Sequence, residues 1–215
     1  MRLIDISQPL GPDTAVWPGD RPVSVDWTLR RRDGDSVNVA AVSLSVHAGT
    51  HADGPLHVND DGPGAGSLPL APFLGPAVVV DARGREQLDA DALDGVALDD
   101  APRVLFRTRD STDPGTFPGH FTAFSTGLAR RLVELGVLLV GTDAPSVDPV
   151  DSTALGAHRI LAAGGVVNVE NLVLDDVAPG RYTFIGFPLR LVEADSAPLR
   201  AVLVDAEDGR RKPGG

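Results

Sequence analysis

The 215-residue chain contains no cysteine, and this absence removes several classes of protein. Disulfide scaffolds, thiol nucleophiles and thiolate metal sites all require cysteine. Any metal ion must therefore be held by nitrogen and oxygen ligands. Long hydrophobic runs are also missing, since no segment approaches the ~18 apolar residues of a membrane span. The N-terminus lacks the apolar stretch of a signal peptide, so a cytoplasmic protein with no membrane partner is expected.

Positive charge is scarce as well. Nineteen lysines and arginines face 30 acidic residues, which gives a formal net charge of −11. Such a surface repels phosphate backbones, so a nucleic-acid partner is disfavoured. The tight basic run Arg30–Arg32 is interpreted as a solvated stretch, because a nucleic-acid footprint needs a wider patch.

The pattern of apolar residues predicts strands interleaved with few helices. Alternation over residues 37–46 predicts a half-buried strand that runs directly into His47. A helix is expected from Ser125 or Thr126 to Leu135, with Gly136 as its stop. Further strands are predicted at 77–81, 104–106, 137–140, 182–191 and 201–204. We therefore expect one α/β domain over residues 1–215 around a central mixed sheet, with a frayed tail at about 207–215.

Three of the five histidines fall within one window of eleven residues, His47-Ala-Gly-Thr-His51-Ala-Asp53-Gly-Pro-Leu-His57. Imidazole and carboxylate are the usual ligands of catalytic divalent metals. His51 and Asp53 are two positions apart, so on a strand both point to one face, ~6.6 Å apart at the backbone. His47 and His51 would lie ~13 Å apart on an extended chain, so a shared metal requires a bend, and Gly49 permits one. The window alone leaves His57 open as a ligand or as an acid/base residue.

The two remaining histidines are less clear from the residues themselves. His120 lies in a loop-like stretch and is interpreted as structural or exposed. His158 precedes an apolar run and is followed twelve residues later by Glu170, which gives only a weak indication of a ligand pair. Trp17, in a loop rich in proline and glycine, is either a core anchor or part of a pocket.

The window from His47 to His57 matches the H-x-G-T/A-H-x-D-x-P-x-H signature of the cyclase-like metal hydrolases, and the chain resembles this family over nearly its whole length. Within the family it is most similar to the bacterial kynurenine formamidases. Val58 and Gly54 depart from residues common in the family, which bears on the substrate more than on the chemistry. The other matching segments are 5–10, 16–20, 141–149, 172–180 and 187–191.

This resemblance implies a site and an assembly. It implies that His47, His51 and Asp53 hold one metal ion, and that a second is held by Asp53, His158 and Glu170, with Asp53 and Glu170 shared. It also implies two zinc ions per subunit, with manganese possible, and a swivelling β/β/α fold in a homodimer or larger homo-oligomer. By the same resemblance His57 is the acid/base residue and Trp17 lines the substrate pocket.

The activity implied is that of a metal-dependent amidohydrolase of the arylformamidase type, which converts N-formyl-L-kynurenine to L-kynurenine and formate in tryptophan degradation. One alternative is a related hydrolase of cyclic amides such as isatin. A second alternative is a non-haem iron oxygenase, since His51, Asp53 and His158 also resemble a facial triad. A third is a metal-binding protein without catalysis.

Overall fold

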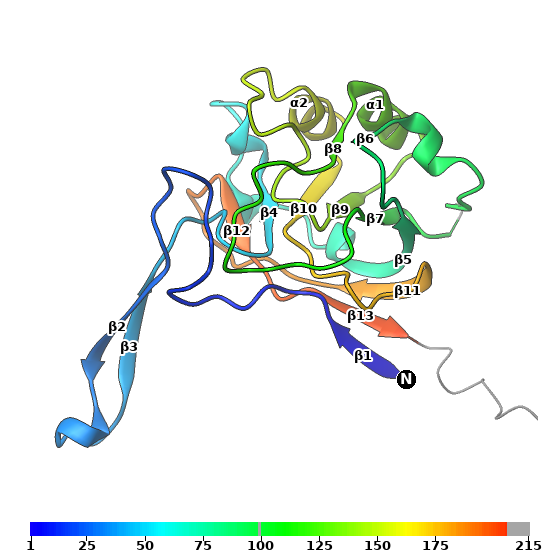
Figure 1. The fold of residues 1–215 in the computed structure, drawn as a ribbon. Coiled ribbons are helices and arrows are strands. Elements are labelled where there is room, and N and C mark those ends of the chain that lie inside the picture. The colour runs from blue at the N-terminus through cyan, green and yellow to red at the C-terminus, as the bar shows by residue number, and fades with distance from the viewer. Residues whose placement is uncertain (99, 206–215) are drawn as a thin grey trace, which may run out of the picture.

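A computed structural model describes residues 1–98 and 100–205, which form a single domain built on one large, curled mixed sheet with few helices (Figure 1). The α/β class expected from the sequence is confirmed. The predicted frayed tail at 207–215 lies outside the described residues. No helix in the described part has the length and apolar character needed to span a bilayer.

Nine strands form the main sheet, in the order β1-β13-β11-β5-β7-β9-β10-β4-β12. Its centre, from β5 to β10, is parallel, and the strands on either side are antiparallel. Two short pairs, β2–β3 and β6–β8, are separate sheets. The main-sheet strands are β1 (Arg2–Asp5), β4 (His51–Asp53), β5 (Leu74–Asp81), β7 (Arg103–Arg107), β9 (Leu139–Thr142), β10 (Val167–Glu170), β11 (Gly180–Ile185), β12 (Ser196–Pro198) and β13 (Val202–Asp205). The minor strands are β2 (Ser24–Leu29), β3 (Val39–Ser43), β6 (Gln87–Leu88) and β8 (Ala123–Phe124).

Both faces of the parallel centre are buried, which explains its continuous apolar runs. In β7, Val104 and Phe106 point towards helices α1 (Thr126–Glu134) and α2 (Gly156–Ala163). Leu105, between them, packs on the opposite face in a second core with residues of β11 and β13. The two helices lie side by side on one face of the sheet (Figure 1). Short 3-10 turns, η1 (Arg31–Asp33), η2 (Pro55–His57), η3 (Ala65–Ser67), η4 (Ala71–Phe73) and η5 (Ala90–Leu93), occupy the connections.

Helix α1 begins and ends as predicted. The Ser125 hydroxyl accepts a hydrogen bond from the Leu128 amide at 3.1 Å, and Gly136 follows the helix with φ +69°. Helix α2 was not predicted, because its N-cap Leu155 has a left-handed conformation and makes no side-chain cap. Its capping group is instead supplied by Asp148, whose carboxylate accepts from the amides of Ala157 and His158, each at 3.0 Å.

The prediction for residues 37–46 was wrong in its extent and burial. β3 ends at Ser43, and turns separate it from the histidine window. It pairs only with β2, in a hairpin that projects away from the body (blue in Figure 1). Val42 is 58% exposed there, and Leu44 and Val46, which continue the alternation, lie beyond the strand, so the pattern did not correspond to a half-buried strand. Similarly, β11 stops at Ile185, and the predicted strand to residue 191 continues as irregular chain.

Candidate metal centre

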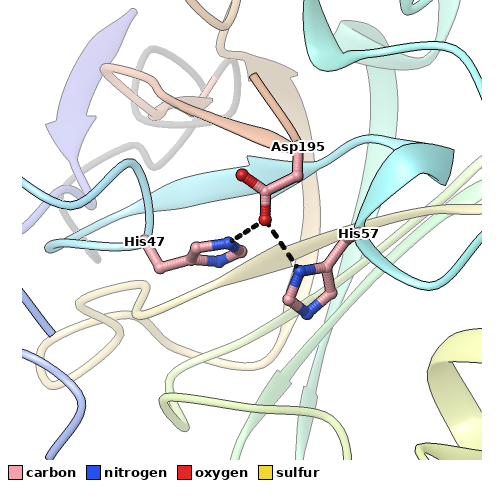
Figure 2. Close-up of side chains that lie close together, drawn as sticks. All are labelled: His47, His57 and Asp195. Carbon is pink, nitrogen blue, oxygen red and sulfur yellow. Dashed lines mark hydrogen bonds and ion pairs between the residues drawn. The ribbon is translucent and has the colours of Figure 1, made fainter. Parts of the chain in front are cut away.

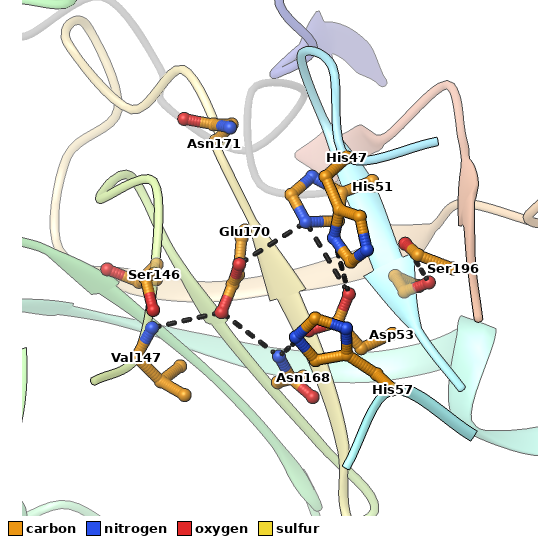
Figure 3. Close-up of polar contacts among 12 residues, drawn as sticks. His47, His51, Asp53, His57, Ser146, Val147, Asn168, Glu170, Asn171 and Ser196 are labelled. Carbon is orange, nitrogen blue, oxygen red and sulfur yellow. Dashed lines mark hydrogen bonds and ion pairs between the residues drawn. The ribbon is translucent and has the colours of Figure 1, made fainter. Parts of the chain in front are cut away.

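Strands β4 and β10 bring the first ligand candidates together. The side chains of His51 and Asp53 leave β4 on the same face, as the period of two predicts. His51 is the direct cross-strand neighbour of Glu170 on β10, and its Nε2 atom lies 3.2 Å from Glu170 Oε2. The same Nε2 lies 3.5 Å from Asp53 Oδ1, so one imidazole faces two carboxylates (Figure 3).

His47 reaches the same cluster through the predicted bend. Gly49 has φ +61°, a left-handed conformation that favours glycine. The bend places His47 Nδ1 3.3 Å from Asp53 Oδ1. The Gly49 carbonyl lies 2.9 Å from His51 Nδ1, which leaves Nε2 of that ring to face the carboxylates. Gly49 therefore shapes the chain and also orients a ligand candidate.

His158 comes from the first turn of α2, more than one hundred residues away in sequence. Its Nε2 lies 3.3 Å from Asp53 Oδ2 and 3.1 Å from Glu170 Oε1. Its Nδ1 lies 2.7 Å from a carboxylate oxygen of Asp148. Ring nitrogens that face away from a metal are typically oriented by a carboxylate or carbonyl in this manner. The five candidates His47, His51, Asp53, His158 and Glu170 thus converge on one place.

Two buried polar atoms in this cluster have no hydrogen-bond partner in the described chain, His51 Nε2 and Asp53 Oδ1. Buried polar atoms without a partner are rare, because desolvation without compensation is costly. Both atoms face the centre of the cluster, and both are types that coordinate divalent cations. The residues present therefore fit a metal ion, and Asp53 belongs to two possible ligand groups, one with His47 and His51 and one with His57 and His158.

The electrostatics of the cluster also favour a cation. Burial opposes protonation of His47, but the hydrogen bond to Asp195 and the nearby Asp53 carboxylate raise its pKa to about 10. Burial and the Asp53 carboxylate act to raise the pKa of Glu170, but His158 and His51 lower it to about 2. The buried carboxylates thus draw positive charge into the site. A divalent ion would supply that charge and release imidazole protons, so binding of metal is expected to be pH-dependent.

His57 and His47 share a partner that the sequence did not reveal. Asp195 Oδ2 lies 2.8 Å from His47 Nε2 and 3.1 Å from His57 Nδ1 (Figure 2). Asp195 precedes β12, the neighbour of β4, so the register of these strands brings it to the histidine window. Nothing in its local sequence distinguishes it from other surface aspartates.

A pocket of about 460 Å³ opens onto the cluster. Trp17 lines it and packs edge-to-face against Phe117, with ring centroids 5.1 Å apart. Trp17 therefore lies at the pocket, which is one of the two interpretations that the sequence allowed, and is not a core anchor. His120 is exposed and is absent from the pocket lining among the described residues.

Asp148 and Asn168 are two more residues of the site without a clear signal in the sequence. Asn168 Nδ2 donates to Asp53 Oδ2 at 2.8 Å and to Glu170 Oε1 at 3.1 Å, and so holds the two carboxylates in place. Asn168 precedes Glu170 by two positions on β10, and this spacing is the one signal that could have placed it beside the site.

The fold and the histidine–carboxylate cluster are those of a metal-dependent hydrolase class, and comparison with known proteins agrees. Residues 4–149 match the sequence profile of the family described as "Putative cyclase". The chain belongs to this family, which confirms the resemblance drawn from its motifs. A kynurenine formamidase of Salinibacter ruber is 48% identical over 97% of this chain and 100% of that protein. One of Sphingopyxis alaskensis is 41% identical over 94% and 97%.

Solved structures share the fold. A potential metal-dependent hydrolase with cyclase activity superposes with a TM-score of 0.81 at 27% identity, over 94% of this chain and 96% of that one. Isatin hydrolase A of Labrenzia aggregata gives 0.79 at 24% identity, over 94% and 93%. At that identity the second match establishes a common fold and no more.

Proposed function

We propose that this protein is a metal-dependent amidohydrolase that converts N-formyl-L-kynurenine to L-kynurenine and formate. The observation that carries the proposal is the pair of unpartnered buried atoms, His51 Nε2 and Asp53 Oδ1, at the centre of a cluster that lies beside a pocket. Identity of 48% to a kynurenine formamidase over nearly the whole chain supports this choice of substrate.

We infer that His47, His51 and Asp53 hold one divalent ion and that Asp53, His158 and Glu170 hold a second. Zinc is the ion proposed, with manganese as the alternative, because nitrogen and oxygen ligands accept both. When bound, such an ion supplies hydroxide at neutral pH by lowering the pKa of water from about 15.7 to about 7, and it polarises the formyl carbonyl.

His57 is proposed to move the proton that the reaction needs. The aniline nitrogen is a poor leaving group as an anion, so it has to be protonated as the C–N bond breaks. With Nδ1 hydrogen-bonded to Asp195, Nε2 of His57 is free to take a proton from water and to deliver it to that nitrogen. Asp195 acts in this scheme as a positioning residue, because it fixes the orientation of the imidazole.

Trp17 is proposed to contact the aromatic ring of the substrate. Its indole is held against Phe117 and Phe121, with centroid separations of 5.1 and 6.4 Å. Aromatic rings prefer such edge-to-face or offset arrangements, and an aryl substrate in the pocket would extend the group. Val16 and Pro118 add apolar surface nearby in the same pocket.

The decisive experiment measures metal content and activity on one preparation. We expect elemental analysis to find up to two zinc or manganese ions per subunit. Removal of metal with dipicolinate should abolish release of kynurenine from N-formyl-L-kynurenine, and adding the metal back should restore it. Full turnover in demonstrably metal-free protein would contradict the mechanism, and metal-loaded protein without formamidase activity would contradict the substrate.

The alternative hydrolase of isatin is tested on the same sample, by comparing kcat/KM for isatin and for N-formyl-L-kynurenine. The oxygenase alternative is less favoured, because a facial triad of His51, Asp53 and His158 leaves the nearby His47 and Glu170 without a role. Oxygen uptake that depends on iron and 2-oxoglutarate would support it nonetheless.

We further propose that the protein is a cytoplasmic homodimer or larger homo-oligomer. The projecting β2–β3 hairpin supports self-association, because an isolated two-stranded hairpin is only marginally stable in water without a surface to pack against. Trp27, Val25 and Val42 are all exposed on this hairpin. A second copy of the chain is the partner that we propose for this surface.

A further inference from the structure

The pocket beside the histidine cluster combines acidic, aromatic, polar and apolar lining residues. Of its described lining residues, Arg109 is the only lysine or arginine. Acidic side chains line the same pocket at Asp20, Asp113, Glu170 and Asp195. In a chain of net charge −11, Arg109 is therefore the permanently cationic side chain of this described lining that an anionic ligand can pair with.

Arg109 is anchored firmly through its backbone. It follows β7, and the buried carboxylate of Asp143 accepts from the amide of Thr108 at 2.9 Å and from that of Arg109 at 3.3 Å. The Arg109 guanidinium also donates through Nη2 to the main-chain carbonyl of Asp143. These contacts fix where the side chain begins and hold one edge of its guanidinium.

Asp143 and Asp175 both favour the charged form of Arg109, but among the described residues no carboxylate oxygen lies closer than 4.0 Å to its guanidinium. Its Nε lies 4.0 Å from Asp143 Oδ1, and burial raises the pKa of that carboxyl, which weakens it as a counter-ion. The side chain is only 21% exposed, and burial lowers the pKa of the guanidinium. Nη1 makes no hydrogen bond to any residue that the structure describes. A partly buried cation with free donors gains strongly from an anionic ligand.

We propose that Arg109 is a specificity-determining residue that binds the α-carboxylate of the substrate's amino-acid group. This inference rests on the proposed function, because N-formylkynurenine carries an α-carboxylate and simple aryl formamides do not. The planar guanidinium fork suits a carboxylate in a bidentate pair. Trp17 would contact the aryl ring and His57 would serve the formamide, and all three residues line the one pocket.

The test compares two substrates on two proteins. Arg109→Gln removes the charge and keeps much of the side-chain length. For N-formyl-L-kynurenine we expect KM to rise about ten- to hundredfold with little change in kcat, because a charge-assisted hydrogen bond to the ground state is lost. For 2′-formamidoacetophenone, which has the aryl formamide but no amino-acid group, both constants should stay within about threefold of the unsubstituted protein.

Three controls accompany this comparison. Arg109→Lys keeps the charge but not the fork, so it should recover part of the affinity. Arg130→Gln, on the exposed side of α1, removes an arginine remote from the pocket and should leave kcat and KM unchanged for both substrates. Calorimetric titration with L-kynurenine and 2-aminoacetophenone gives a readout without turnover, and only L-kynurenine should bind more weakly to Arg109→Gln.

The outcomes separate this inference from the proposed function. An equal loss of kcat/KM for both substrates would mean that Arg109 acts only through the fold of its loop, and this would overturn the inference. Unchanged KM for N-formyl-L-kynurenine in an active Arg109→Gln protein would overturn it as well. If the unsubstituted, metal-loaded protein hydrolyses neither substrate, the proposed function itself fails.

Discussion

Asp53 and His57 lie four residues apart and have very different surroundings. Asp53 is buried, and its two oxygens face His47, His51 and His158. His57 is partly exposed, and the hydrogen-bond partner of its ring is Asp195. A carboxylate shared by three imidazoles is placed to hold metal, whereas a ring at the rim of the cluster is placed to exchange protons.

This difference predicts separable effects of substitution. His57→Ala should retain its metal and lose kcat by about 10²- to 10⁴-fold, because a positioned proton carrier is removed. Asp53→Ala should lose both metal and activity, because its carboxylate contacts the histidines of both proposed ion sites. Elemental analysis with steady-state kinetics checks both, and loss of metal from His57→Ala would show that His57 is itself a ligand.

Single residues also show how far the sequence could reveal the site. His47, His51 and Asp53 are close in sequence, and a strand period with one glycine bend was enough to predict their convergence. His158 and Glu170 required family resemblance, since no local pattern links them to position 51. Asp195 and Arg109 were not predicted as site residues, because each reaches the pocket through tertiary structure alone.

Helix α2 carries His158, and Asp148 contacts both the start of this helix and the imidazole ring of His158. Its carboxylate accepts from two amides at the start of α2 and contacts His158 Nδ1 at 2.7 Å. Asp148→Ala should weaken metal binding about 10- to 100-fold, because the ring loses its orienting partner. The lost cap should also lower the free energy of unfolding by about 1 kcal/mol.

Competition with a chromogenic chelator measures the affinity, and urea unfolding of the metal-free protein measures the stability. Asp151→Ala is the matched control, since Asp151 is exposed in the turn before α2. Unchanged metal affinity in Asp148→Ala would show that His158 does not depend on this contact for its position.

The edge strand β1 is joined to the segment just before β13 by an ion pair between Asp5 and Arg200. The hydrogen bond from the Arg200 guanidinium is the main cause that lowers the pKa of Asp5 below 3.8. A lowered folded-state pKa stabilises the protein above the ordinary value, and this contribution disappears as the pH falls through the lowered one. Arg200→Gln should therefore lower the thermal midpoint at pH 7, and the difference should vanish in strong acid.

The effect should be small, at most about 3 °C, because both side chains are largely solvated and the pair is screened by salt. Thermal scans at several pH values, repeated in an Asp5→Asn background, isolate the pair. A difference that persists at a pH where Asp5 is protonated would assign the loss to packing instead.

Elements were predictable where their signals are local. Ser125 caps the start of α1 and Gly136 follows its end, so both boundary signals lie beside the helix in the sequence. Helix α2 lacks such a signal, because its capping carboxylate lies seven residues before Leu155. Of the alternating apolar residues at 42, 44 and 46 only Val42 lies in β3, and the environment that it meets is decided by tertiary structure.

For the whole molecule, the projecting hairpin leads to a prediction about assembly. Val25 pairs with Val42 and Trp27 with Ala40, so their side chains share one face of the hairpin. Trp27 is 46% exposed in a single chain. Trp27→Asp should shift the protein towards monomers, because a charge in an apolar contact is strongly disfavoured.

Light scattering coupled to size-exclusion chromatography gives the mass directly. Leu70→Asp places the same charge on an exposed residue beside η4 and should leave the assembly unchanged. A monomeric unsubstituted protein, or an oligomer that persists in Trp27→Asp, would contradict a role for the hairpin in self-association.

Strand β4 is only three residues long, and it is paired on both sides, with β10 and with β12. A slip of one position would reverse its faces, so Ala52 would point into the cluster and both neighbouring side chains would point away. A chain trapped in that misaligned state would lack the arrangement of side chains that the proposed metal site needs, even if it were compact. The fraction of refolded protein that loads with metal therefore reports how faithfully this strand finds its neighbours.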